Sequence, residues 1–378
     1  MKLSRRQTLQ LGFGAFLGAG CTQMSQLSNS AFGMPSKDFP IKGSLSLKQR
    51  AAAKGIIFGA AANQRDVVRD TEYAQVLAKD CGILVPENDL KWADLRPSPD
   101  QFDFQRGDWM AQFTKQHGLL LRGHTLAWHQ SNPEWLKDIT RQQAEQVLVK
   151  HIHTVVKHYA GRMHSWDVVN EAIDGAWSDR ADKLQPTQWV KLLDKNYIEI
   201  AFRAAAAADP NAILVYNDTS VDYDVPEDNR TRAAILKLLE SLKSRNVPIH
   251  ALGIQGHLDA AEKRFNEKKF RDFLSEVAGM GLKILITELD VSDRSLPADI
   301  HVRDRAVADA IEQYLSVALD ERAVSAVITW GISDRYTWLS RYPRPDKLPV
   351  RTLPYSDTMQ RKLAWNAIAR SFDAAPKR

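Results

Sequence analysis

The sequence predicts an α/β fold, a single closed (β/α)8 TIM barrel, on three observations. First, short apolar runs typical of strands alternate with amphipathic segments typical of helices from Leu45 onward. Second, eight such pairs occupy residues 45–373, a length within the range of these barrels. Third, polar residues end nearly every strand and no G-x-G-x-x-G turn follows the first, which argues against an open doubly wound sheet.

The predicted strands are short runs rich in apolar, β-branched and aromatic residues. In chain order they are residues 55–61 (GIIFGAA), 82–88 (GILVPEN), 119–128 (LLLRGHTLAW), 164–171 (HSWDVVNE), 212–218 (AILVYND), 251–257 (ALGIQGH), 283–290 (KILITELD) and 326–334 (AVITWGISD). The segments between them include amphipathic helices at residues 141–160 and 300–319.

Polar and aromatic side chains gather at the ends of these strands, and a barrel brings the carboxyl ends of its strands onto one face. Taken singly, each is explained by a helix cap or a hydrogen bond in the core. As a set, they supply the acids, amides, imidazoles and indoles of a carbohydrate cleft. They are Glu87, Asn88, Lys91, His124, Trp128, His129, Asn170, Glu171, Asn217, Asp218, Gln255, His257, Glu288, Asp290, Trp330, Asp334 and Trp338.

Two of these acids carry the functional hypothesis. Glu171 follows Asn170 at the end of an apolar run, and strand alternation would point these two side chains to opposite faces. Glu288 ends a second such run, 117 residues later (288 − 171). Paired carboxylates suggest glycoside cleavage, in which one protonates the leaving oxygen and the other attacks or activates water. A lone Glu at a strand end is more often a helix cap or a solvated loop residue.

Composition excludes other classes of protein. The net charge of +5 falls to +2 (5 − 3) without residues 1–33, which carry Lys2, Arg5 and Arg6 but no acid, so no nucleic-acid partner is expected. Two cysteines exclude a disulfide framework, and we expect Cys81 to be a small buried hydrophobe. The ten Trp residues offer flat platforms for sugars, although core packing is the usual role of any one of them.

Neither a metal nor another cofactor is expected. His151 and His153 superficially match a metallohydrolase pair, but they fall within the helical run 141–160, where positions i and i+2 do not share a face. No compact cluster of His and Asp ends the early strands.

Residues 1–33 are predicted to be an export signal, and residues 34–44 a leader or tether. The string Ser4-Arg5-Arg6-Gln7-Thr8-Leu9 resembles a twin-arginine signal, and the apolar stretch 11–19 is too short to span a membrane. Cleavage is expected at one of two places. A cut before Cys21 would leave a lipid-anchored lipoprotein, although Gly18 stands where that pattern prefers Leu, and a cut after Gly33 would leave a soluble protein. Either product would be periplasmic or extracellular.

Six segments resemble the signature motifs of glycoside hydrolase family 10, the retaining endo-β-1,4-xylanases built on (β/α)8 barrels. They are PENDLKW (86–92), GHTLAWHQSNPEWL (123–136), WDVVNEAI (166–173), GIQGHL (253–258), ITELDVS (286–292) and TWGISD (329–334). The resemblance runs from about Leu45 to about Phe372 and keeps the order of the family. No single motif is decisive, but six in order on the expected strands are very specific.

The resemblance implies a role for each of these residues. Glu171 would be the general acid/base and Glu288 the nucleophile. Asn170 would hydrogen-bond the 2-hydroxyl of the sugar being cleaved, and His257 with Asp290 would hold Glu288 in place. Xylose units on the non-reducing side would be bound by Glu87, Asn88, Lys91, His124 and Gln255 and covered by Trp128, Trp330 and Trp338. A retaining mechanism also needs carboxyls roughly 5–5.5 Å apart with unequal pKa values.

The resemblance therefore implies a secreted retaining endo-1,4-β-xylanase that acts on xylan or xylo-oligosaccharides, and we expect a monomer. Thr219, Thr337 and Leu339 depart from the residues that the family tends to carry, and these rim positions bear on subsite preference. A related retaining β-1,4-glycanase, acting on cellulose or mixed-linkage glucan, remains an alternative. A non-catalytic surface sugar-binding protein is disfavoured, because both acids are present with their partners.

Overall fold

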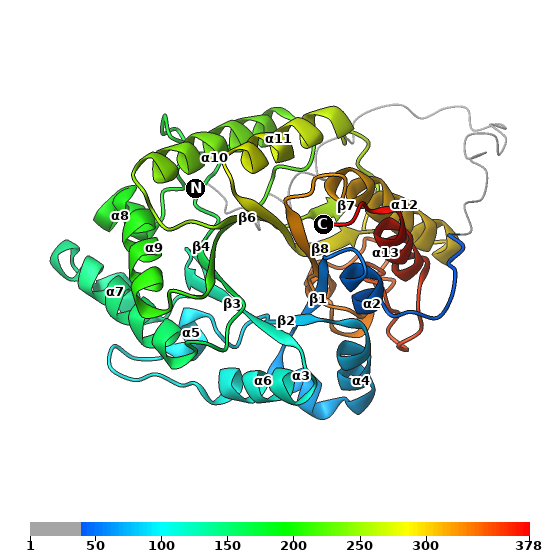
Figure 1. The fold of residues 1–378 in the computed structure, drawn as a ribbon, viewed down its shortest axis with the longest axis horizontal. Coiled ribbons are helices and arrows are strands. Elements are labelled where there is room, and N and C mark those ends of the chain that lie inside the picture. Colours follow the sequence, from blue (N-terminus) through cyan, green and yellow to red (C-terminus); the bar gives the residue numbers. More distant parts are fainter. Residues whose placement is uncertain (1–38) are drawn as a thin grey trace.

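The computed structural model describes residues 39–378 as a closed parallel barrel surrounded by helices (Figure 1). The barrel strands are β1 (Ile57–Ala62), β2 (Ile83–Pro86), β3 (Leu120–Ala127), β4 (Ser165–Asn170), β5 (Ile213–Asp218), β6 (Ala251–Ile254), β8 (Lys283–Ser292) and β9 (Val324–Thr329). β1 pairs in parallel with β9, with Ile57 opposite Ala326, and β6 pairs with β8, so the barrel closes. The predicted (β/α)8 TIM barrel is confirmed.

The sixth predicted strand is divided in the structure. β6 ends at Ile254, Gly256 adopts a left-handed φ of 74°, and a short strand β7 (His257–Asp259) follows. β8 is 10 residues long and continues past the end of β6, so its last residues pair with β7. This pairing sets His257 directly opposite Asp290.

The helices form an outer ring around the strands (Figure 1). They are α2 (Leu47–Ala52), α3 (Gln64–Arg69), α4 (Thr71–Asp80), α5 (Trp92–Leu95), α6 (Gln105–Gln116), α7 (Arg141–His158), α8 (Gln188–Leu193), α9 (Asn196–Ala208), α10 (Pro226–Ser244), α11 (Glu267–Gly279), α12 (Ile300–Ala318) and α13 (Leu363–Ala374), with the 3-10 helices η1 (Glu134–Asp138), η2 (Asp334–Tyr336) and η3 (Trp338–Arg341).

The helix predicted at residues 141–160 is α7, and it separates the two histidines that resembled a metal pair. His151 is fully buried and stacks on Trp92 with 3.5 Å between the ring centroids, whereas His153 is exposed. The two imidazoles therefore lie on different sides of the helix, as its period requires. Within residues 39–378, no group of three or more His, Cys, Asp or Glu side chains is placed to hold a metal ion.

Side chains fill the inside of the barrel. Val215, Ala251, Leu285 and Ala326 come from four different strands and form one buried cluster there. Cys81 is fully buried beside the barrel, which confirms its predicted role as a small hydrophobe. Packed side chains therefore close the inside of the barrel beneath the carboxyl ends of the strands. The cavity described below lies above these side chains.

Both ends of the described chain pack against the barrel. Phe39 is fully buried, and Arg370 of α13 donates a hydrogen bond to the carbonyl of Pro40. Residues 39–44 are predicted to belong to the leader, but in the structure this segment contacts the fold. Burial of the Phe39 ring stabilises that contact. At the other end, Arg378 donates to the carbonyl of Val324, so the packed chain extends past residue 373.

The export signal predicted at residues 1–33, with Cys21 and both cleavage sites, lies outside the described residues. Among the helices of residues 39–378, none has the length and apolar character needed to cross a bilayer.

Gly123 of β3 provides a test of the barrel packing. A Cβ at this position would lie 2.0 Å from the ring of Trp166, which is fully buried opposite it in β4. We expect Gly123→Ala to lower the free energy of unfolding by about 1–3 kcal/mol, because the indole has no space to move into. Gly279→Ala is the control, since a Cβ there meets nothing within 4 Å. Thermal unfolding measures both, and equal melting temperatures would contradict the packing described here.

Candidate active site

A cavity of about 340 Å³ lies at the carboxyl ends of the strands. Its wall contains most of the site residues predicted from the sequence: Lys91, His124, Trp128, Asn170, Glu171, Gln255, His257, Glu288, Asp290, Trp330 and Trp338. Glu87 and Asn88 lie beside this wall, where Asn88 accepts a hydrogen bond from Lys91 and donates one to Glu87. The barrel thus brings together residues from six of its strands and the segments that follow them.

Glu171 and Asn170 both face the cavity, so the alternation predicted for them is wrong. Asn170 is the last residue of β4, and Glu171 adopts a left-handed φ of 53°. The amide of Glu171 still donates to the carbonyl of Asn217 in β5, so the backbone turns while it remains attached to the sheet. This turn ends the strand period and directs two successive side chains into one cavity.

The Glu171 carboxylate is partly exposed and is held by uncharged donors. The indole nitrogen of Trp128 donates to its Oε2 at 3.0 Å, and the amide of Gln255 donates to its Oε1 at 3.0 Å. His129 Nδ1 lies 3.9 Å from Oε2. Two uncharged donors, Trp128 and Gln255, therefore hold the Glu171 carboxylate in position.

Glu288 is buried and has a charged partner. Its Oε1 accepts a hydrogen bond from Asn217 Nδ2 at 2.8 Å, and its Oε2 lies 3.3 Å from His257 Nε2. Burial by itself raises the pKa of Glu288, but the hydrogen bond to His257 and the charges of His124, His257 and Lys91 outweigh it, so this pKa lies below the usual value for Glu. Glu288 is therefore a carboxylate at neutral pH.

His257 links this carboxylate to a second one. Its Nδ1 lies 2.8 Å from Asp290 Oδ1, and Trp338 donates its indole N–H to Asp290 Oδ2 at 2.6 Å. Burial lowers the pKa of His257, but the charge and hydrogen bond of Asp290, together with Glu288, raise it well above the usual value. His257 is therefore an imidazolium between two carboxylates, and its orientation is set by Asp290.

Asn217 connects the two halves of the site, a role that sequence reasoning missed. Its Oδ1 accepts a hydrogen bond from Thr287 at 2.7 Å, which directs its Nδ2 toward Glu288 Oε1 and Asn170 Oδ1, both at 2.8 Å. Gln255 donates to Asn170 Oδ1 at 3.4 Å as well as to Glu171. A usable signal was present, because Asn217 lies near the end of β5 as Asn170 lies at the end of β4.

A second polar group lies where β1 and β2 end. Asn63 donates to Glu87 Oε2 at 2.9 Å, and Asn88 donates to the Oδ1 of Asn63 at 2.9 Å. Lys91 donates to Asn88 Oδ1 at 3.1 Å. Burial raises the pKa of Glu87, and Lys91 partly opposes that effect. Asn63 was not predicted from the sequence, although it too follows a barrel strand.

His124 forms the base of the cavity on this side. It is 1% exposed, and its Nδ1 lies 3.0 Å from Asp167 Oδ2, while Arg122 pairs with the other oxygen of Asp167. The ring of Trp330 meets His124 edge to face, with 5.1 Å between centroids, and Lys91 Nζ lies 5.1 Å from the Trp128 ring. Two indoles and a cation thus lie around an imidazole that Asp167 holds in place.

Two of the polar residues at strand ends serve the fold instead of the cavity. Asp218 accepts hydrogen bonds from the backbone N–H groups of Ile173 and Thr219. Asp334 accepts from the N–H groups of Thr352 and Leu353 and pairs with Lys362 at 2.7 Å. Neither acid lines the cavity.

Comparison with known proteins gives one consistent result. The family model described as glycosyl hydrolase family 10 matches residues 46–371. Endo-1,4-beta-xylanase B of Thermotoga neapolitana is 32% identical over 272 residues, which cover 71% of this chain and 75% of that protein. The crystal structure of native xylanase 10B from Thermotoga maritima matches with a TM-score of 0.78 and 32% identity over 87% of this chain and 98% of that one. Xylanase 10B from Thermotoga petrophila RKU-1, solved with xylobiose, matches with a TM-score of 0.78 and 31% identity, covering 88% and 99%.

The electrostatics of Glu288 can be tested directly. We expect His257→Ala to raise the pKa of Glu288, because burial would then act without the imidazolium that opposes it. Lys91→Met is the control, since the charge of Lys91 lowers this pKa less than His257 does, so its loss should raise the pKa less. Carboxyl carbon NMR titration measures the value, and an unchanged pKa in His257→Ala would rule out the proposed coupling.

Proposed function

The chain belongs to glycosyl hydrolase family 10, and we propose that this glycoside hydrolase is a retaining endo-1,4-β-xylanase that cleaves internal β-1,4 bonds of xylan. The observation that carries the proposal is the pair of carboxylates in one cavity with unlike partners, Glu288 beside an imidazolium and Glu171 among uncharged donors. Relatives named as endo-1,4-β-xylanases, and a related structure solved with xylobiose, support the choice of substrate.

In the first step, Glu288 acts as the nucleophile. One of its oxygens attacks the anomeric carbon and the bond to the leaving sugar breaks, while Glu171 gives its proton to the leaving oxygen. The depressed pKa of Glu288 supports this assignment, because a nucleophile must be deprotonated at working pH. The result is a covalent glycosyl-enzyme, and Glu171 is left as a carboxylate.

In the second step, Glu171 acts as the base and Glu288 is the leaving group. Glu171 takes a proton from water, the water oxygen attacks the anomeric carbon, and Glu288 departs as a carboxylate. His257 supports this departure, because the imidazolium stabilises the returning negative charge. Two inversions at one carbon give net retention.

Asn170 is proposed to bind the 2-hydroxyl of the sugar being cleaved. Its Oδ1 accepts hydrogen bonds from Asn217 and Gln255, which turns its Nδ2 toward other acceptors. Gln255 directs its Nε2 to Glu171 and Asn170, so we assign it the positioning of Glu171 in addition to the sugar contact implied by resemblance.

The sugars on the non-reducing side are proposed to lie toward the ends of β2 and β3. Glu87, Asn88 and Lys91 form a connected set of donors and acceptors there, and His124 offers its Nε2 from the base. Trp128, Trp330 and Trp338 supply aromatic faces in the same cavity.

A β-1,4-glucan would carry an extra hydroxymethyl group at C5, which must fit beside these indoles. Trp338 is held by its bond to Asp290, and Trp330 packs on His124, which limits how far either ring can shift to admit the larger sugar. Reducing-end release from xylan beside carboxymethyl-cellulose distinguishes the two substrates, and equal release would favour the broader β-glycanase.

The roles of the two acids predict different responses to azide. We expect Glu288→Ala to lose on the order of 10⁴-fold or more in kcat, and azide to restore turnover by giving an α-glycosyl azide. Glu171→Ala should still form the intermediate from an activated aryl glycoside, and azide should then give the β-product. Product stereochemistry by NMR is the measurement.

Glu87→Ala is the matched control, because Glu87 is a buried carboxylate beside the same cavity with no proposed reacting role. Its activity should not respond to azide. Identical azide products from the Glu288 and Glu171 variants would overturn the assignment.

We also propose that the enzyme is exported, on the strength of Arg5-Arg6 followed by a weakly apolar stretch. Replacing both arginines with Lys should trap the precursor in the cytoplasm, because this route depends on receptor recognition. Intact mass of the mature wild-type protein then separates the two cleavage sites, since a chain beginning at a lipidated Cys21 differs from one beginning at Met34. A mature protein that keeps Arg5-Arg6 would defeat the proposal.

A further inference from the structure

A second cavity of about 340 Å³ lies on the outer side of the barrel, where it forms a groove along α10. The opposite side of this groove is formed by the loop after β4 and by Lys195, which precedes α9. Figure 1 shows α8, α9 and α10 next to one another around the barrel. Residues of α10 from Arg230 to Ser241 line the groove, and eleven steps along a helix (241 − 230) rise about 16 Å. The groove is therefore longer than a single small ion requires.

Basic side chains predominate in the lining of the groove. They are Lys183, Lys195, Arg230 and Lys237. Asp182 is the one acid among the described residues that line it, and Arg180 forms a bidentate pair with its carboxylate, with both distances 2.8 Å. A cleft lined mainly by one sign of charge concentrates ligands of the opposite sign. The groove is therefore expected to attract an anion.

The floor of the groove is apolar. Ile173 and Leu184 are buried and line it, and Leu238 of α10, which is half-buried, lines it as well. A sugar ring carries C–H groups on its faces and polar groups at its edge, so it can cover such a floor while its edge reaches the cations. A sugar chain that carries carboxylates fits this combination better than inorganic phosphate does, because phosphate has no apolar surface.

An exposed indole lies beside the groove. Trp177 is 51% exposed, and it is the only aromatic residue among the large apolar side chains that are exposed in the described part of the chain. Two groove residues hold the backbone on either side of it. Arg230 Nε donates to the carbonyl of Gly175 at 2.6 Å, and Lys183 Nζ donates to that of Ser178 at 2.8 Å. The indole has apolar area to bury and a flat face that suits a sugar ring, so Trp177 adds a second surface for the same ligand.

The groove lies close to the catalytic cavity along the chain and differs from it in charge. Glu171 lines the catalytic cavity, and Ile173, two residues later, lines the groove. The catalytic cavity is lined by seven Asp or Glu residues and by two Lys or Arg residues, Lys91 and Arg294. The groove has one acid and four basic residues. A chain that carries carboxylates is therefore attracted more strongly to the groove than to the cavity.

We propose that the groove and Trp177 form a second, non-catalytic binding site for polysaccharide that carries carboxylates, namely the uronic-acid-substituted segments of xylan. The inference rests on the proposed function for the identity of the polymer, and on the charge of the groove for its acidic substituents. Lys195 and Lys237, both exposed, bind the carboxylates, and Trp177 stacks on a sugar ring. The site holds the polymer near the cavity and takes no part in bond cleavage.

The test measures polymer binding in the Glu288→Ala background, in which the polymer is not cut. The two polymers are a glucuronoxylan and the same glucuronoxylan after chemical reduction of its carboxylates to alcohols. For Lys195→Gln combined with Lys237→Gln, we expect Kd for glucuronoxylan to rise about fivefold and Kd for the reduced polymer to change by less than about twofold. The rise should shrink at about 1 M salt, because salt screens exposed charges.

Lys243→Gln combined with Lys283→Gln is the matched control. It removes the same charge from two exposed lysines, one of them also on α10, that do not line the groove. Its Kd for either polymer should stay within about twofold of the parent. Trp177→Ala should weaken the binding of both polymers about equally, because stacking does not depend on the carboxylate. With Glu288 restored, every variant should keep kcat/KM for neutral xylohexaose within about twofold, since none of the changed residues lines the cavity.

An unchanged Kd for glucuronoxylan in the Lys195 and Lys237 variant or in Trp177→Ala would overturn the inference, as would an equal loss on both polymers in the lysine variant. Binding of duplex DNA that depends on Lys195 and Lys237, with binding of glucuronoxylan independent of them, would also overturn it, because the groove would then be a nucleic-acid surface. A wild-type protein that binds glucuronoxylan through the groove but hydrolyses no xylan would overturn the proposed function and support the groove as a site for acidic polysaccharide.

Discussion

A charged carboxylate buried at the mouth of the barrel is the constraint on which the rest of the site depends. Glu288 is 5% exposed, and burial alone would favour its neutral form. His257 prevents this, but an imidazole can do so only if it is itself protonated and aimed correctly. Asp290 supplies both conditions, and Trp338 in turn holds Asp290. One desolvated charge therefore requires a chain of partners that extends from β8 through β7 to the loop after β9.

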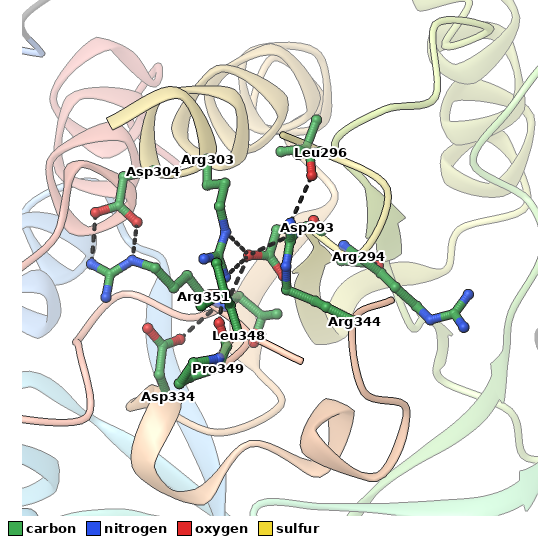
Figure 2. Close-up of polar contacts among 12 residues, drawn as sticks. Asp293, Arg294, Leu296, Arg303, Asp304, Asp334, Arg344, Leu348, Pro349 and Arg351 are labelled. Carbon is green, nitrogen blue, oxygen red and sulfur yellow. Dashed lines mark hydrogen bonds and ion pairs between the residues drawn. The ribbon is translucent and has the colours of Figure 1, made fainter. Parts of the chain in front are cut away.

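The same constraint explains the shape of β8 and its short neighbour. If β8 ended level with β6, the backbone of Asp290 would have no strand to pair with. Nothing would then fix the distance between His257 and Asp290. The extra length of β8 and the turn at Gly256 place β7 where its first residue meets Asp290. Beyond Ser292, the Asp293 carboxylate pairs with Arg303 and Arg344, while the side chain of Arg294 is directed away from them (Figure 2). β8 and the residues after it thus connect Glu288 to the loop after β9.

The two acids differ because their partners differ, even though Asn170, Asn217 and Gln255 connect them in one hydrogen-bond network. The His257 cation beside Glu288 strongly stabilises the ionised form of the Glu288 carboxylate. Neutral indole and amide donors fix the place of Glu171 without imposing a full charge on it, which suits a group proposed to lose and regain a proton in each cycle. The network holds the two carboxylates in a fixed relative position.

Much of this protein could be read from local patterns, because strand runs, helical spacing and acids at strand ends depend on residues close together in the chain. The closed barrel, the burial of Cys81 and the separation of His151 from His153 follow from such patterns. The sequence by itself also singled out Glu171 and Glu288. Tertiary structure alone decided that Glu171 turns into the cavity beside Asn170, that the sixth strand divides, and that Phe39 belongs to the fold. It also decided how Asn217 acts, because its side-chain partners Asn170, Thr287 and Glu288 lie 47, 70 and 71 residues away and no local period records which distant group a side chain will meet.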